Sequence, residues 1–198
     1  MNMKTINNIP VYSIKALTID QGICGVSLVD WPAMDVKWEA FGKEKEILKF
    51  SVVDEEEHKV LSPLIRCDFP ILRYDVHQGE YYVIFDKETT ERIARKFLAD
   101  GFAWNVTLDH VEENYADGVR LEQLFLKDTN RGISPVGFEE VAEGSLFGVW
   151  KIENEDIWQL IKDGTYNGMS LEGRFTMTPE EDEVETLEQL LQHLGIEE

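Results

Sequence analysis

The chain has 198 residues, a formal net charge of -20, 43% hydrophobic residues and 11% aromatic residues. This length and composition fit one folded domain with a substantial core and exclude a mostly disordered chain. The negative charge argues against nucleic-acid binding, because the rest of the surface would repel a phosphate backbone at every contact. We therefore expect protein partners and no nucleic acid.

The sequence also argues against membrane, cofactor and metal functions. No stretch reaches the roughly 20 uncharged apolar residues of a membrane helix, and the first residues lack the apolar block of a secretory signal. Neither GxxxxGK[ST] nor GxGxxG occurs, and Cys24 and Cys67 have no metal-ligand spacing. We expect a soluble, intracellular protein with free core thiols, no membrane partner, no cofactor and no metal.

Strands and helices are predicted in an irregular order. Runs rich in aromatic and β-branched residues predict strands over 79–85, 105–110, 119–126 and 145–152. The strands do not alternate regularly with helices, and no internal repeat is apparent. This order predicts an α+β fold on an antiparallel sheet or barrel.

Two helices interrupt these strands. The first is predicted between the N-cap Asp86 and the terminating Gly101, and the second between Asn154 and Gly164. Apolar spacing predicts the inward-facing residues of both helices, which are Ile93, Phe97 and Leu98 in the first and Ile157, Trp158 and Ile161 in the second.

The composition changes near Pro179. The acidic run EEDEVE is followed by apolar residues at helical spacing, which are Val184, Leu187, Leu190, Leu191 and Leu194. We expect a domain over 1–178, then an acidic hinge and an amphipathic helix over 179–198. A helix packed on its own domain and a detachable docking tail both fit this pattern.

One of the four histidines lies where a strand is expected to end. His58 lies in the charged stretch DEEEHK, His77 in the turn-like DVHQGE and His193 on the tail helix. His110 ends NVTLDH, where period-two alternation places it on the face of Val106 and Leu108. An imidazole held there suits a general base.

The stretch NGMSLEGRF, residues 167–175, holds a serine that the histidine would need. Ser170 shares a strand face with Glu172 and Arg174. If the strands over 105–110 and 119–126 form a hairpin, Glu122 lies diagonal to His110. Glu122 and Glu172 therefore both stay open as the acid that orients the imidazole. No GxSxG motif surrounds Ser170, so the residues alone fit an ordinary strand serine as well as a nucleophile.

An ordered set of motifs resembles a known family. GEYYVIFDKETTERIARKFL, NVTLDH and GVWKIENEDIWQLIKDGTYNGMSLEGRF follow one another as in the XkdF-like serine proteases of phages, a branch of the prohead proteases. The early GVSLVDWPAM is similar to their G-x-SLV-x-x-PA segment. The similarity spans about residues 22 to 177.

The resemblance implies a fold and a pair of catalytic residues. It implies an assemblin-like fold, in which an antiparallel β-barrel-like core is flanked by helices, as in herpesvirus capsid proteases. The histidine of the family falls on His110 and its nucleophilic serine on Ser170. The third member varies across these proteases, so Glu122 and Glu172 stay open and rank ahead of His193. An Arg-bearing loop near the serine supplies an oxyanion donor in such enzymes, which makes Arg131 in DTNRGISPVG a candidate.

The resemblance also implies a biological task. It is the cleavage of phage scaffold and major capsid protein segments, and of the protease itself, inside assembling procapsids in the bacterial cytoplasm. A second hypothesis is a catalytically silent assembly factor that binds scaffold or capsid protein through its acidic surface and tail. A third is an unrelated bacterial domain. The oligomeric state stays open.

Overall fold

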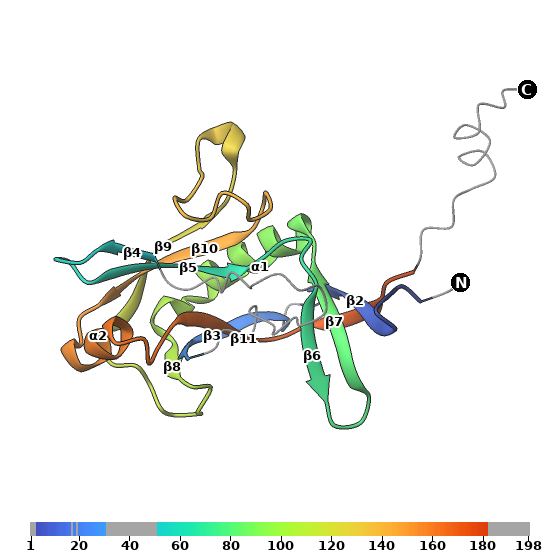
Figure 1. Ribbon diagram of the computed structural model, residues 1–198, viewed down its shortest axis with the longest axis horizontal. Helices are drawn as coiled ribbons and strands as arrows, with labels where there is room; N and C mark the ends of the chain where they lie inside the picture. The colour runs from blue at the N-terminus through green and yellow to red at the C-terminus, as the bar shows by residue number, and fades with distance from the viewer. Residues whose placement is uncertain (1–2, 17, 19, 31–50, 182–198) are drawn as a thin grey trace, which may run out of the picture.

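The computed structural model describes residues 3–16, 18, 20–30 and 51–181 (Figure 1). The strands are β1 (Thr5–Ile6), β2 (Ile9–Lys15), β3 (Gly22–Val29), β4 (Ser51–Asp54), β5 (Lys59–Ile65), β6 (Ile71–Asp75), β7 (Gly79–Phe85), β8 (Val106–Leu108), β9 (Val119–Leu126), β10 (Leu146–Ile152), β11 (Gly168–Arg174) and β12 (Thr176–Pro179). The helices are α1 (Lys87–Asp100) and α2 (Glu155–Lys162), with short 3-10 turns η1 (Phe102–Trp104) and η2 (Thr129–Arg131).

The strands form three sheets. One sheet has the order β4-β5-β10-β9, a second has the order β11-β3-β8, and the third has the order β1-β2-β7-β6 with β12 paired to β2. The pairs β2·β7 and β3·β8 are parallel, and the other pairs are antiparallel. The α+β class is therefore confirmed. The described strands form no closed barrel, so the expected antiparallel β-barrel-like core is corrected to three sheets, two of which contain a parallel pair.

One apolar core joins the three sheets and both helices. Its largest fully buried side chains include Trp150 of β10, Trp158 of α2 and Phe97 of α1. Helix α1 lies next to β3, β9 and β10, and it separates β7 in one sheet from β8 in another. Between β3 and β8 the chain passes through β4 to β7 and then α1, and this long crossover brings β8 alongside β3 in the parallel direction.

The helices begin and end as predicted. The Asp86 carboxylate accepts the Thr89 N–H at 2.7 Å, and Gly101 closes α1 in the left-handed conformation with φ 78°. The Asn154 side chain caps α2. The predicted inward residues are buried, with the exception of Leu98, whose side chain is 57% exposed. Leu98 is about 100° around the helix from Phe97, beyond the narrow buried stripe of α1.

The predicted strands are found, but the predicted hairpin between β8 and β9 is wrong. Strand β9 pairs with β10, whereas β8 pairs with β3. The loop after β8 returns only as far as Tyr115, which forms an isolated bridge with Thr107. The two strands therefore belong to different sheets, and the register that placed Glu122 beside His110 does not exist.

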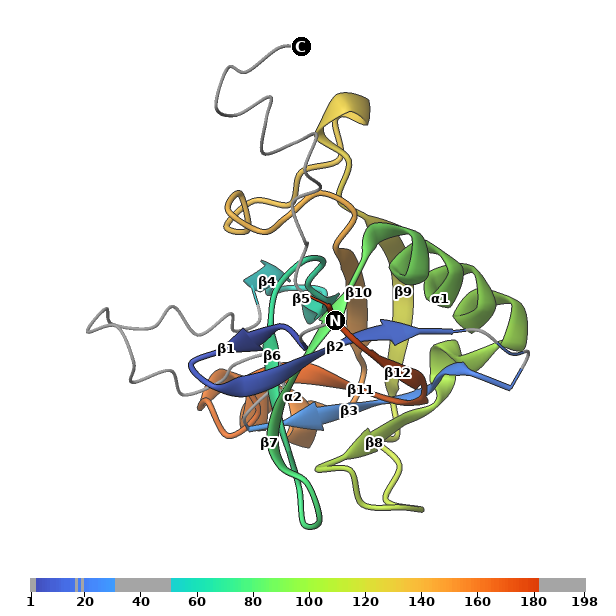
Figure 2. The same ribbon diagram turned by 90° about the vertical axis from the view of Figure 1, so that its right-hand side faces the viewer.

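The C-terminal part of the chain passes from one sheet to another. After β11 leaves β3, the chain continues as β12 along β2, where Pro179 lies opposite Tyr12 (Figure 2). Glu181 forms a bridge with Met3. The amphipathic tail helix, His193 and the WPAM part of the early motif lie outside the described residues.

The cysteines differ in exposure, since Cys67 is a buried free thiol as expected, but Cys24 is exposed. No helix in the described ranges is long and apolar enough to cross a membrane.

Candidate active site

A row of three hydroxyl side chains crosses the sheet of β11, β3 and β8. Ser170 lies opposite Ser27, and Ser27 lies opposite Thr107. Residues directly opposite each other in neighbouring strands project from the same face of a sheet. Glu172 follows Ser170 by two positions and shares this face, while the alternate residues Met169 and Leu28 are fully buried in the core. The sheet therefore has one apolar face and one polar face.

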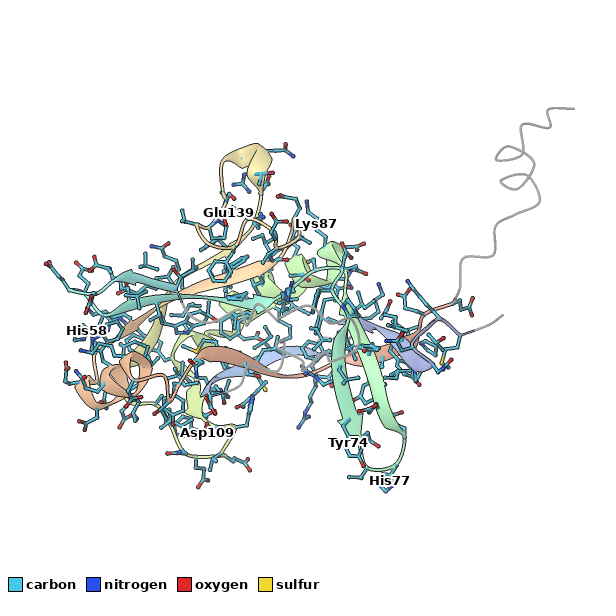
Figure 3. The ribbon with its side chains drawn as sticks, viewed as in Figure 1. His58, Tyr74, His77, Lys87, Asp109 and Glu139 are labelled. Atoms are coloured by element: carbon cyan, nitrogen blue, oxygen red, sulfur yellow. The ribbon has the colours of Figure 1, made fainter. Side chains whose placement is uncertain are left out.

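His110 joins the polar face through a sharp turn after β8. Asp109 and His110 have φ values of 54° and 56°, in the left-handed region that non-glycine residues rarely adopt. The Asp109 N–H donates to Leu28 O at 2.9 Å, and the His110 N–H donates to Ser27 Oγ at 3.3 Å. Figure 3 labels Asp109 at this end of β8. The turn brings His110 to the side of Thr107, so the prediction that it continues the face of Val106 and Leu108 is wrong.

Glu172 connects the turn to the sheet. Its Oε1 lies 3.1 Å from His110 Nδ1 and accepts hydrogen bonds from Ser27 Oγ at 2.6 Å and Thr107 Oγ1 at 2.8 Å. The residue opposite Glu172 on β3 is Gly25, where an added Cβ would meet Glu172 Oε2 at 3.3 Å. Because Gly25 has no side chain, the Glu172 carboxylate can lie across β3 and reach the turn.

The electrostatics of this cluster favour an ionised acid beside the imidazole. Partial burial acts to raise the pKa of Glu172, but hydrogen bonds from Ser27, Thr107 and His110, together with the His110 charge, lower this pKa below its ordinary value of 4.5. An ionised Glu172 can accept a hydrogen bond from His110 Nδ1–H, and in a neutral imidazole with this tautomer the lone pair of Nε2 is free. This is the tautomer that a general base needs.

Ser170 lies on the same face but is less accessible than the histidine. Its side chain is 5% exposed, and the described residues contain no hydrogen bond between Ser170 and His110. The Cα atoms of Ser170 and Thr107 are two strand intervals apart, roughly 10 Å. The Met169 N–H, which precedes the serine, donates to Ser62 Oγ at 3.3 Å on the β5 side of the strand.

The structure does not bring Glu122 to His110. Glu122 lies on β9, where its carboxylate is 3.2 Å from Lys59 Nζ and 3.3 Å from an Arg120 guanidinium nitrogen. The charge of the Glu122 carboxylate is balanced by these two cationic side chains. Of the two acids that the sequence left open, Glu172 is therefore the one that contacts the imidazole.

Arg131 is also placed away from the histidine. It ends η2 in the loop that projects from β9 and β10, whereas β8 lies at the opposite end of the molecule in both ribbon views (Figures 1 and 2). Its side chain is 75% exposed and 4.0 Å from Asp128. The remaining described histidines lie elsewhere, since His58 stacks on Trp158 and His77 lies in the turn between β6 and β7.

Three residues of the cluster were missed by the sequence reasoning, namely Gly25, Ser27 and Thr107. Two of them lie in the GVSLV stretch, which carried part of the family resemblance without any role being assigned to it. Alternation within NVTLDH places Thr107 and Val106 on different faces of the strand. Nothing in the sequence indicates that His110 would lie on the face of Thr107.

The comparisons with known proteins support one family. Residues 72–178, more than half of the chain, match the family model described as "Putative phage serine protease XkdF". The match includes His110, Ser170 and Glu172 but not β3. No curated protein and no solved structure is detectably similar to the chain. Because the family model covers most of the polar cluster and more than half of the residues, the chain belongs to the phage protein family that carries this description.

Proposed function

We propose that the protein is a serine endopeptidase in which Ser170 is the nucleophile, His110 the general base and Glu172 the acid that orients the imidazole. One observation carries this proposal. Glu172 shares a strand and a face with Ser170, and its carboxylate lies 3.1 Å from His110 Nδ1. The imidazole is therefore held by the strand that bears the serine, with Nε2 left for the proton of the nucleophile.

The chemistry is acyl transfer. Nε2 of His110 takes the proton of Ser170 as its hydroxyl attacks the scissile carbonyl, and the imidazolium then protonates the leaving amine. Water hydrolyses the acyl-enzyme by the same two steps. Glu172 stays ionised and stabilises the imidazolium. Arg131 takes no part in this proposal, because its loop lies at the other end of the molecule.

The contact between Ser170 and His110 forms when substrate binds. Catalytic hydrogen bonds are often long in free enzymes and shorten in the Michaelis complex. His110 is well placed for such a shift, because its side chain is 43% exposed and its ring is anchored through Nδ1.

The substrates that we propose are phage scaffold and capsid protein segments, cleaved inside the assembling procapsid in the bacterial cytoplasm. The family is a phage protease family, which supports a role in the phage cycle. The net charge of -20 favours basic substrate segments by electrostatic steering, and salt weakens this effect. Self-cleavage near the acidic segment after Pro179 belongs to the same proposal.

One observation favours the alternative of a catalytically silent assembly factor. Ser170 is 5% exposed and has no hydrogen bond to His110, so the serine is not activated in this conformation. A silent factor would bind scaffold or capsid protein with the same fold and without cutting it.

Cleavage of the natural partners separates the two functions. We would incubate the wild type, Ser170→Ala and His110→Ala with the scaffold or capsid protein encoded beside it and follow the products by intact mass spectrometry. We expect the wild type to cut and both variants to be slower by about 10⁴-fold or more. His77→Ala, in an exposed turn, is the matched histidine control and should cut normally.

A fluorophosphonate probe tests the nucleophile without a substrate. Covalent labelling of Ser170 in the wild type, lost in His110→Ala, is the expected result for an activated serine. Binding of scaffold protein without cleavage and without labelling would contradict the protease and favour the silent factor.

A further inference from the structure

One oxygen atom of Glu172 accepts all the hydrogen bonds that the described residues make to its carboxylate. Oε1 faces His110 Nδ1, Ser27 Oγ and Thr107 Oγ1. Residues Ser27 and Thr107 are buried, with Thr107 7% exposed as a whole residue, whereas the Glu172 side chain is 32% exposed. Two fixed hydroxyls therefore hold a long side chain that would otherwise be free to turn toward water.

The proton count of the cluster shows what the hydroxyls can do. Ser27 Oγ also contacts Thr107 Oγ1, so three oxygen–oxygen contacts join Ser27, Thr107 and the ionised Glu172. The two hydroxyl protons can fill two of these contacts. Both protons can point to Glu172, or either hydroxyl can donate to the other, which then donates to Glu172. In each of these three arrangements Ser27 is engaged as a donor and has no hydrogen bond to an imidazole nitrogen, so it is not a second nucleophile.

Ser27 also holds the turn that carries His110. Its oxygen accepts the His110 N–H at 3.3 Å, next to the Asp109 N–H that donates to Leu28 O. These two bonds oppose the cost of two successive left-handed residues. Ser27 thereby links the backbone of the base to the carboxylate of the acid through one atom.

We propose that Ser27 and Thr107 are positioning residues that hold the Glu172 carboxylate against His110 Nδ1 and thereby set the tautomer of the imidazole. This inference rests on the proposed protease function for its kinetic consequence. Its structural part, the dependence of the imidazole tautomer on two hydroxyls of β3 and β8, holds for the chain whether or not it cuts.

The test uses matched variants of the full chain. Thr107→Val removes the hydroxyl and keeps the shape, and Thr107→Ser restores the hydroxyl. Ser27→Ala removes the second donor. Ser145→Ala is the control, because Ser145 is also fully buried but bonds to the Cys67 N–H, far from the cluster in sequence. The readouts are kcat and KM for the cleaved partner protein and the ¹⁵N spectrum of His110, which distinguishes the Nδ1–H from the Nε2–H tautomer.

We expect kcat to fall about 10-fold in Thr107→Val and up to about 100-fold in Ser27→Ala, with KM little changed, since misplacement of a catalytic group by about 1 Å has effects of this size. The Nδ1–H fraction of His110 should fall in both variants. Thr107→Ser should recover the wild-type values, and Ser145→Ala should show them throughout.

Unchanged kcat and an unchanged tautomer in Thr107→Val would overturn the inference. If the wild type cuts nothing, the tautomer alone decides. The missing cleavage would count against the protease function. A reduced Nδ1–H fraction would still support the positioning role, and an unchanged fraction would overturn it. If a thermal unfolding scan shows that Ser27→Ala does not fold, the comparison of Thr107→Val with Thr107→Ser decides the test.

Discussion

Two polar clusters in this molecule differ in how completely their hydrogen-bonding groups are used. Lys127, which follows β9, is 3% exposed, and its ammonium group donates to the carbonyl oxygens of Phe138, Glu139 and Val141 at 3.3, 2.5 and 2.7 Å. All three donors of the ammonium have a partner within the loop that they hold. A buried charge satisfied in this way stabilises a loop and has no capacity left for a ligand.

The His110–Glu172 cluster is only partly satisfied. Glu172 Oε1 has three donors, but the described residues provide no hydrogen bond to His110 Nε2, and both side chains are about a third or more exposed. An open imidazole nitrogen beside a held carboxylate is typical of a reactive site. The comparison shows that unused hydrogen-bonding capacity, rather than charge or burial alone, distinguishes the proposed site from a structural cluster.

The sharpest way to test this contrast is to neutralise one acid at a time. Glu172→Gln should lower kcat by about 10³-fold, because an amide does not stabilise the imidazolium and disturbs the tautomer. Glu122→Gln should leave kcat within about twofold of the wild type, because the Glu122 carboxylate contacts Lys59 and Arg120 and not His110. Cleavage kinetics with the natural partner measure both. Equal losses in the two variants would remove Glu172 from the site.

A second test removes the satisfied charge. Lys127→Met should lower the free energy of unfolding by about 3 kcal/mol, since three carbonyl groups in buried or partly buried hydrogen bonds lose their donor. Urea denaturation measures this loss. The rate of fluorophosphonate labelling of the folded protein should not change. A slower labelling rate with normal stability would show that the two clusters are coupled.

The smallest expected effect is a pH dependence of stability. The pKa of Glu172 lies below 4.5 in the folded protein, so the folded state binds this proton less readily than the unfolded state. The carboxylate therefore adds stability above about pH 4.5, and this contribution is lost as the pH falls through the folded-state pKa. Urea unfolding at pH 6 and pH 3.5 should show that the free energy of unfolding falls less on acidification in Glu172→Gln than in the wild type. Equal decreases in the two proteins would contradict this role of Glu172.

Local signals in the sequence were sufficient to predict most of the helices and strands. The strand over 79–85 and the strand over 119–126 have the predicted bounds, and both helices have the predicted caps, because capping, turn residues and apolar spacing act over a few neighbouring positions. The spacing of two also placed Ser170 and Glu172 together on one face, which the sheet retains up to the irregularity after Glu172.

These local signals could not predict which strands pair with one another. The shortest connection suggested that β8 pairs with β9, and that pairing would have placed Glu122 beside the histidine. The structure pairs β8 with β3, about 80 residues earlier in the chain, because the apolar faces of β3 and β8 bury together against α1 and the core. This pairing brings Ser27 next to Thr107 and His110, while the pairing of β3 with β11 places Gly25 opposite Glu172.

The sequence by itself determined the α+β class, the caps of the helices, the common face of Ser170 and Glu172, and the family. These depend on short-range periodicity and on the order of motifs. Only the tertiary structure decided which acid meets His110. That choice depends on a parallel pairing between distant strands and on two left-handed residues at 109 and 110, whose conformation is stabilised by hydrogen bonds from another strand rather than by their own preferences.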